Sequence, residues 1–232
     1  MIGPEKPLIN PDDAFILPSK DGGRRELFAL ISINVDYNVG KWENALESLA
    51  RRELAMLDSR KFFDFICHLK KGKVFNGRGE EVAPERVKAV LDSIVNPSEQ
   101  WKGEYLDNCF LYSGEEVRVH YNHKLEEGKL VPGHDEIVLN YIREEGYIRM
   151  PNLNKQGVAT QRMSDEEFYA LLRGEPKPGD AVFYYYPRRL EDGKKSVTVY
   201  STFKDGATLA CVWNLNLTKK NLGVRPVQFY KV

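Results

Sequence analysis

Helical and strand-forming patterns occupy different parts of this chain, and that division constrains its fold more than any other feature. Apolar residues recur at helical spacing in three stretches of the first half, which are 42–57, 59–69 and 84–95. β-prone runs with turn residues between them fill the last quarter, and these runs are 181–186, 197–203, 208–213 and 224–230. Helices that precede strands favour an α+β fold. We therefore expect helices mainly in the N-terminal half and a strand-rich C-terminal half.

The start of the chain has little regular pattern. Four prolines exclude a regular helix there, so residues 1–26 are expected to be extended and rich in turns. Residues 27–35 (LFALISINV) form a short apolar run that fits either a strand or the start of a buried helix. Residues 134–142 leave the same choice open, because their periodicity does not distinguish helix from strand.

Two short elements are predicted in the middle of the chain. The alternating run 116–121 (EVRVHY) predicts a strand. Ser164 and Glu167 have the spacing of a capping box, which predicts a short helix that ends at Leu172. Because no repeat, low-complexity tract or clear linker divides the sequence, we expect a single domain over residues 1–232.

Composition excludes several classes of protein. The chain has 232 residues, with 34 Lys and Arg balanced by 34 Asp and Glu. Residues 180–232 hold nine basic and four acidic residues, a net charge of +5, so the tail is basic although the whole chain is neutral. A general nucleic-acid-binding surface is not indicated. No apolar run approaches the roughly 20 residues that span a bilayer, and the N-terminus does not resemble a signal peptide. We expect no membrane insertion, and a cytoplasmic or virion-associated location.

Cysteine and histidine residues do not form a recognisable metal motif. Cys67, Cys109 and Cys211 are too few and too scattered for a disulfide framework, and no CxxC pair is present. His120 and His123 would point to opposite faces of a strand, which argues against a site shared with the next histidine, His134. We therefore expect no metal and no cofactor.

Cys109 is the one candidate nucleophile. The segment Asp107–Cys109, followed by Pro178–Phe183 (PGDAVF), resembles cell-wall cysteine peptidases. That family needs a histidine on the strand after the PGD turn, to deprotonate the thiol. Here the strand 196–200 (SVTVY) has no histidine. We therefore predict that the protein is not an enzyme, with a Cys109-dependent hydrolase as a remote alternative.

Aromatic and basic residues are interleaved from residue 184 to residue 230. Strand alternation directs about half of the aromatic side chains into the core. The others would share a surface with the basic residues, and Tyr, Trp and Arg dominate binding hot spots. Stacking rings next to positive charges also suit single-stranded nucleic acid. The composition alone leaves both kinds of partner open.

Particular residues of the tail indicate a protein family more specifically than the composition does. They are Tyr184-Tyr185-Tyr186-Pro187-Arg188, then Val197, Tyr200, Ala207, Leu209 and Cys211, then Leu222–Val227. Upstream, Asn96-Pro97, Trp101, Glu104–Asp107, Gly128–Pro132 and Leu153–Gly157 match the same pattern. Together these segments resemble variable proteins of diversity-generating retroelements, which carry a C-type-lectin-like fold. The resemblance covers most of the chain and implies an archaeal, bacterial or viral source.

In that family a reverse transcriptase copies a template repeat and randomises its adenines, so that chosen codons vary between sister copies. The resemblance implies a variable ligand-binding region over about 184–221 and a closing strand over 222–232. Its implied ligand-binding residues are Tyr184, Tyr186, Arg188, Ser201, Phe203, Lys204, Asp205, Thr208, Ala210, Val212, Trp213, Asn214, Asn216, Lys219, Lys220 and Asn221.

Strand alternation agrees with part of this assignment. If Leu209 and Cys211 face the core together with Val197, then Thr208, Ala210 and Val212 face outward, where substitution costs little. The resemblance implies a ligand-binding protein whose partner is a macromolecule, either a protein or a cell surface, rather than nucleic acid. Calcium-dependent sugar binding is not expected, because the residues after Glu175-Pro176 and Trp213-Asn214 supply no convergent oxygen ligands.

Overall fold

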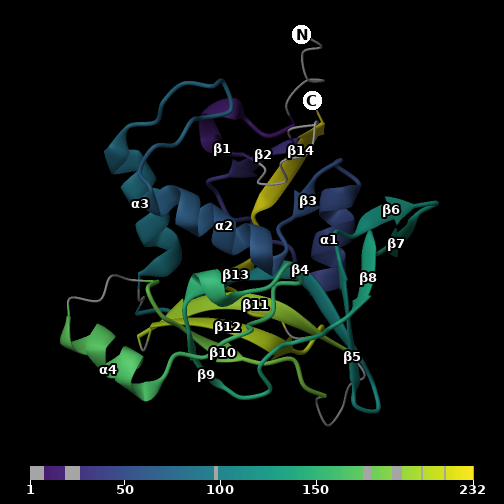
Figure 1. The fold of residues 1–232 in the computed structure, drawn as a ribbon. Helices are drawn as coiled ribbons and strands as arrows, with labels where there is room; N and C mark the ends of the chain where they lie inside the picture. The colour runs from purple at the N-terminus through teal and green to yellow at the C-terminus, as the bar shows by residue number, and fades with distance from the viewer. Residues whose placement is uncertain are drawn as a thin grey trace.

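The computed structural model describes residues 8–18, 27–96, 99–174, 179–189, 195–204, 206–216 and 218–231, and Figure 1 shows its α+β fold. The described α-helices are α1 (Trp42–Ala50), α2 (Ser59–Lys70), α3 (Pro84–Val95) and α4 (Asp165–Arg173). Short 3₁₀ helices cover Pro11–Asp13 and Met150–Asn152. The predicted order of helices and strands is confirmed in outline, although two strands precede α1.

Local signals place the helix ends. Asp58 precedes α2, and its side chain accepts a hydrogen bond from the backbone N–H of Lys61. Pro84 occupies the first turn of α3, where its missing N–H costs nothing. Ser164 and Glu167 form the predicted capping box at the start of α4.

The first predicted helix is shorter than its apolar pattern suggested. α1 ends at Ala50, and Glu53 takes a left-handed backbone conformation with φ of 57°. The backbone N–H groups of Glu53 and Leu54 bond back to Ala50 and Leu49, each at 3.0 Å, which closes the helix. Part of the remaining predicted helix is instead the strand β3 (Ala55–Met56).

The described strands form two main sheets and a hairpin. A four-stranded sheet has the order β1-β2-β14-β3, where β1 is Ala14–Pro18, β2 is Leu27–Ser32 and β14 is Pro226–Lys231. The run at 27–35 is therefore a strand, and the segment predicted to be extended includes β1. The hairpin is formed by β6 (Lys124–Glu126) and β7 (Lys129–Val131).

The larger sheet has the order β8-β5-β4-β11-β12-β10-β9, with β13 beside β4. Its strands are β4 (Lys102–Ser113), β5 (Glu116–Tyr121), β8 (His134–Ile137), β9 (Gly146–Ile148), β10 (Val182–Tyr185), β11 (Lys195–Phe203), β12 (Gly206–Trp213) and β13 (Leu222–Gly223). The run at 134–142 thus begins as a strand. The predicted closing strand over 222–232 is two strands, β13 and β14, which lie in different sheets.

The register defines the two faces of the larger sheet. Tyr200, Leu209 and Tyr184 are cross-strand partners, and all three are buried in the main core with α2 and α3. Figure 1 shows these helices on one side of the sheet. We call this the inner face.

The opposite face, here called the outer face, carries the row Gly103, Ser201, Thr208, Phe183 and Tyr147, which are also cross-strand partners. α1 covers one end of the outer face, where it packs on Tyr105, Val197 and Val199. The prediction that Val197 shares a face with Leu209 and Cys211 is wrong. Odd residue numbers on two different strands share a face only if the register between the strands pairs them.

Candidate functional site

Five of the predicted ligand-binding residues lie on the outer face. Ser201 pairs directly with Thr208, and Phe203 follows Ser201 by two positions on the same strand. Ala210 pairs with Val199. A β-bulge lies between this pair and the next, so that Trp213 pairs with Val197 and lies on the same face as Val197. The predicted outward orientation of Thr208 and Ala210 is confirmed, although Ala210 is only 7% exposed and Ser201 only 8%.

Beside Gly103 on this face lies a cluster of Trp101, Trp213 and Lys219, which we call the tryptophan cluster. The two indole rings stack with centroids 5.7 Å apart and planes 11° apart. The Lys219 ammonium lies 4.4 Å from the Trp101 ring and 5.0 Å from the Trp213 ring, within cation–π distance of both. The sequence interpretation had included Trp213 and Lys219 in the site but not Trp101, which is distant in the chain.

Backbone contacts hold the tryptophan cluster in place. The side-chain amide of Asn221 donates to the Trp101 carbonyl at 3.1 Å, and Gly103 N–H donates to the Asn221 carbonyl at 2.9 Å. Gly103 makes room for the stacked ring, because an added Cβ would lie 3.0 Å from the edge of the Trp101 ring. The predicted residue Asn221 therefore has a supporting role here.

The loop after β12 adds polar and basic groups beside the cluster. Lys41 donates to the Asn216 side chain at 3.4 Å, and the Asn214 side chain accepts from Asn216 N–H at 2.9 Å. Lys220 is exposed. Within the described residues, Lys41, Lys219 and Lys220 have no carboxylate ion-pair partner. The surface around the tryptophan cluster is therefore basic.

Tyr184 is a correction to the predicted site. Its side chain is completely buried in the main core, because it alternates with its outward-facing neighbours on β10. Burial raises the pKa of the Tyr184 hydroxyl well above its ordinary value. A residue in this position supports the fold and cannot touch a ligand on the outer face.

The other predicted residues lie at the margins of the site. Arg188 forms an ion pair with Glu145 at 2.7 Å and lies 5.5 Å from the Tyr186 ring, beyond the end of β10. Lys204 pairs with Glu99 at 3.0 Å near the β11–β12 turn. Val212 is half-buried, and Asp205 lies outside the described residues.

A second group of aromatic rings, which the sequence interpretation did not assign to the site, extends the outer face toward α4. Tyr147 stacks on Phe168 of α4 at 4.1 Å and meets Phe183 edge-on at 5.2 Å. Phe183 in turn lies 5.0 Å from Tyr185. Thr208 is the partner of Phe183 in the row that leads from this group to Gly103. Aromatic residues thus lie at both ends of the outer face.

Cys109 has none of the features of an activated nucleophile. Its side chain is 4% exposed, and burial raises its pKa to about 12. Within the described residues, no histidine is hydrogen-bonded to its sulfur. The thiolate needed for attack is therefore scarce at neutral pH.

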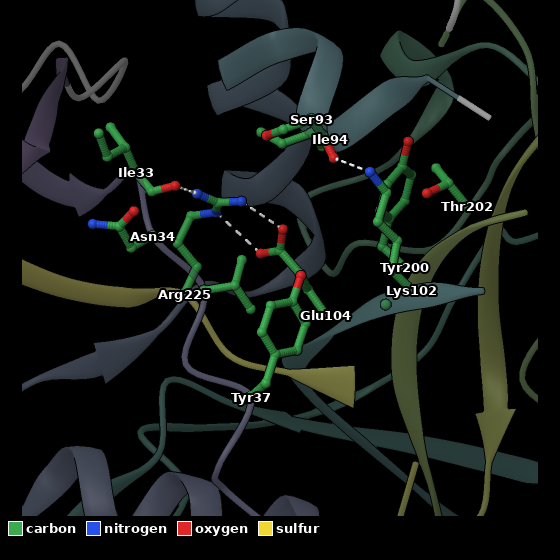
Figure 2. A pocket seen from close by; sticks show the side chains of 12 residues that line it. Ile33, Asn34, Tyr37, Ser93, Ile94, Lys102, Glu104, Tyr200, Thr202 and Arg225 are labelled. Carbon is green, nitrogen blue, oxygen red and sulfur yellow. Dashed lines mark hydrogen bonds and ion pairs between the residues drawn. The ribbon is translucent and has the colours of Figure 1, made fainter. Parts of the chain in front are cut away.

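A cavity of about 350 Å³ lies between the two sheets, and Figure 2 shows the ion pair at its wall. Arg225 donates to both carboxylate oxygens of Glu104, at 2.6 and 3.0 Å, and to the carbonyls of Ser32 and Ile33 at 3.0 and 2.6 Å. Its donors are thus directed at protein acceptors rather than into the cavity. We assign this ion pair a structural role, that of joining β14 and β2 to β4.

The histidines converge, contrary to the sequence prediction. The rings of His120 and His123 lie 6.4 Å apart, because Asn122 takes a left-handed conformation with φ of 54° and turns the chain after β5. His123 pairs with the buried Asp107, and His120 lies 3.2 Å from Asp135. Across the described part of the chain, no group of three or more metal-ligating side chains is arranged to hold an ion.

Comparisons with known proteins were negative. No family model, no curated protein and no solved structure matches the chain. Among the helices of the described ranges, none is both long enough and apolar enough to cross a membrane.

Proposed function

We propose that the protein is a ligand-binding protein that uses the outer face of a C-type-lectin-like scaffold to present a diversified surface. One observation carries the proposal. Ser201, Thr208 and Trp213, all selected as variable positions from the sequence, share the outer face, whereas the intervening Leu209 and Cys211 are fully buried. A variable position on this face changes the ligand contacts without disturbing the core.

Two features of the fold support the proposed scaffold. The C-terminal strand β14 pairs with β2, so the two ends of the chain join one sheet, as a closing strand would require. β13 returns to the larger sheet beside β4, next to Gly103 and Glu104. The loop from Asn214 to Asn221 thus begins and ends on rigid strands, the arrangement that binding loops commonly have.

The tryptophan cluster would provide the main contact area. Two stacked indole rings form a large, rigid, partly exposed surface, and such residues dominate the energies of protein interfaces. The exposed Lys219 and Lys220 would steer acidic partners toward it. Asn214 and Asn216 add adaptable hydrogen-bonding groups, so different side chains at these positions would select different ligands.

Sequencing this gene and its flanking DNA across the source population tests the proposal. We expect substitutions at Thr208, Trp213 and Asn216, with a near-copy of this stretch nearby that carries adenines at the changing codons. Leu209 and Cys211 are the matched controls, and their codons should stay constant. Uniform variation, or the absence of a template copy, would overturn the proposal.

A second function is favoured by one observation, the unpaired lysines around stacked rings. This arrangement suits single-stranded nucleic acid. The test is fluorescence anisotropy with a labelled oligothymidylate at 50 and 200 mM salt. Binding that weakens steeply with salt, and that Trp213→Ala abolishes, would support the alternative, whereas no binding at 50 mM would exclude it.

A further inference from the structure

A second cavity, of about 620 Å³, lies away from the outer face. Its walls come from the turn after α1, the first turn of α2, the β5–β6 connection, the start of β8 and the strand β14. No member of the tryptophan cluster lines it. Cavities of 300–1,000 Å³ are the usual size of small-molecule sites. This cavity therefore has room for a ligand of its own.

One wall of the cavity is apolar. Leu54, Leu125, Val227 and Phe229 contribute to it. Phe229 is 40% exposed, although Gln228 and Tyr230, its neighbours on β14, are 8% and 9% exposed. When an apolar ligand covers exposed apolar surface in a concave site, the free energy of the complex falls. The wall therefore favours a ligand with an apolar body.

The polar end of the cavity has one unused donor at Lys61. Its ammonium group is hydrogen-bonded to Asp58 and to the Asn122 side chain, the latter at 3.0 Å. An ammonium group has three protons, so one is left for a ligand. The same nitrogen lies 5.5 Å from the centroid of the Phe229 ring, which places it beside the apolar wall.

His123 contributes an acceptor. Its Nδ1 is bonded to the Asp107 carboxylate, and its backbone N–H donates to the same carboxylate at 2.8 Å. Asp107 is 1% exposed, so the imidazole orientation is rigidly held. A carboxylate only accepts hydrogen bonds, so in the neutral imidazole the proton is on Nδ1 and Nε2 keeps its lone pair. Within the described residues, Nε2 makes no hydrogen bond and is not among the fully buried unpaired atoms.

Both lysines that line the cavity already have carboxylate partners. Lys61 pairs with Asp58, and Lys124 with Glu126 at 2.6 Å. At the polar end an anionic ligand would find no unpaired lysine and a cationic ligand would meet the Lys61 ammonium group, while a hydroxyl group both donates and accepts. It could donate to His123 Nε2 and accept from Lys61.

We propose that this cavity binds a neutral hydroxylated molecule, an alcohol or a phenol, whose apolar body lies on Phe229. The site is independent of the outer face, so either proposal can fail without the other.

The experiment compares p-cresol with toluene, which differ only in the hydroxyl group, by ligand-observed NMR on the full chain. We expect p-cresol to bind about tenfold more tightly than toluene, the factor that one hydrogen bond supplies. Equal affinities, or no binding of either probe, would overturn the proposal.

Variants locate the binding. His123→Phe removes the acceptor and should reduce the preference for p-cresol, while toluene still binds. Because this change leaves the buried Asp107 without its partner, Leu125→Trp is a second variant that fills the cavity and should abolish binding of both probes. Lys88→Met, at an exposed position of α3 that lines neither cavity, is the matched control and should change nothing. Binding that survives Leu125→Trp in the folded protein would refute this location.

Discussion

Replacing Glu104 by leucine tests the assignment of the Arg225–Glu104 pair as the contact that joins the two sheets. The Arg225 side chain is 3% exposed and that of Glu104 is 9% exposed. Two charge-assisted hydrogen bonds connect them, at 2.6 and 3.0 Å. Glu104→Leu removes both bonds and leaves the guanidinium group buried without a counter-charge.

The expected loss of unfolding free energy follows from the charge that stays buried without a partner. Removing one partner of a buried ion pair costs about 3–5 kcal/mol, because the other charge stays desolvated and unpaired. Arg225→Met should cost a similar amount for the Glu104 carboxylate, plus a contribution from the Ser32 and Ile33 carbonyls that lose their donor. In the double variant neither charge of the pair remains. Glu104→Leu should therefore destabilise the native protein but stabilise the Arg225→Met variant.

Urea unfolding at pH 7, followed by circular dichroism, measures these free energies if all four proteins show similar m-values. The reversal of sign is the decisive result. A loss below about 1 kcal/mol for Glu104→Leu, or a destabilisation in both backgrounds, would refute a structural role for the pair.

Three further predictions concern the helix end, the thiols and the outer face. Glu53→Gly should stabilise the protein by about 1 kcal/mol, because glycine relieves the left-handed conformation at φ of 57°, whereas Glu53→Ala should not; equal urea midpoints for the two variants would contradict this. Burial raises the pKa of Cys109 and of Cys211 from about 9 to about 12, so their contribution to stability is complete below pH 9 and is lost as the pH rises toward 12. Thermal unfolding from pH 8 to pH 11 should show this loss, and the double alanine variant should show less of it. Gly103→Val should displace the Trp101 ring and red-shift the tryptophan emission, with Gly103→Ala giving a smaller shift; an unchanged spectrum for Gly103→Val would refute the close packing.

The helices were predictable because their signals are local. α2 and α3 match the predicted ranges within a residue, and the capping box at Ser164 starts α4 as expected. α1 was predicted too long, since an apolar pattern continues into β3 and only the left-handed Glu53 ends the helix. Helical spacing and caps act within a few residues, so the chain alone encodes them.

The central strand β4 was missed, for a reason that lies in its surroundings. β4 is buried on both faces, so its sequence (KGEYLDNCFLYS) does not alternate between apolar and polar residues. Its polar residues are satisfied by distant partners. Glu104 meets Arg225, Asp107 meets His123, and the Asn108 side chain accepts from Ser59 at 2.7 Å. No local sequence pattern predicts such distant partners.

Local sequence patterns were enough to predict the α+β composition, the ends of α2 and α3, the start of α4, and the alternation of Thr208, Leu209 and Ala210 on β12. Which residues of neighbouring strands share a face could be known only from the folded structure, because that depends on the register between strands. The fold moved Tyr184 into the core and brought Trp101 onto Trp213. It also turned His123 toward His120. Periodicity is a property of neighbouring residues, whereas stacking and ion pairing between distant segments exist only after the chain has folded.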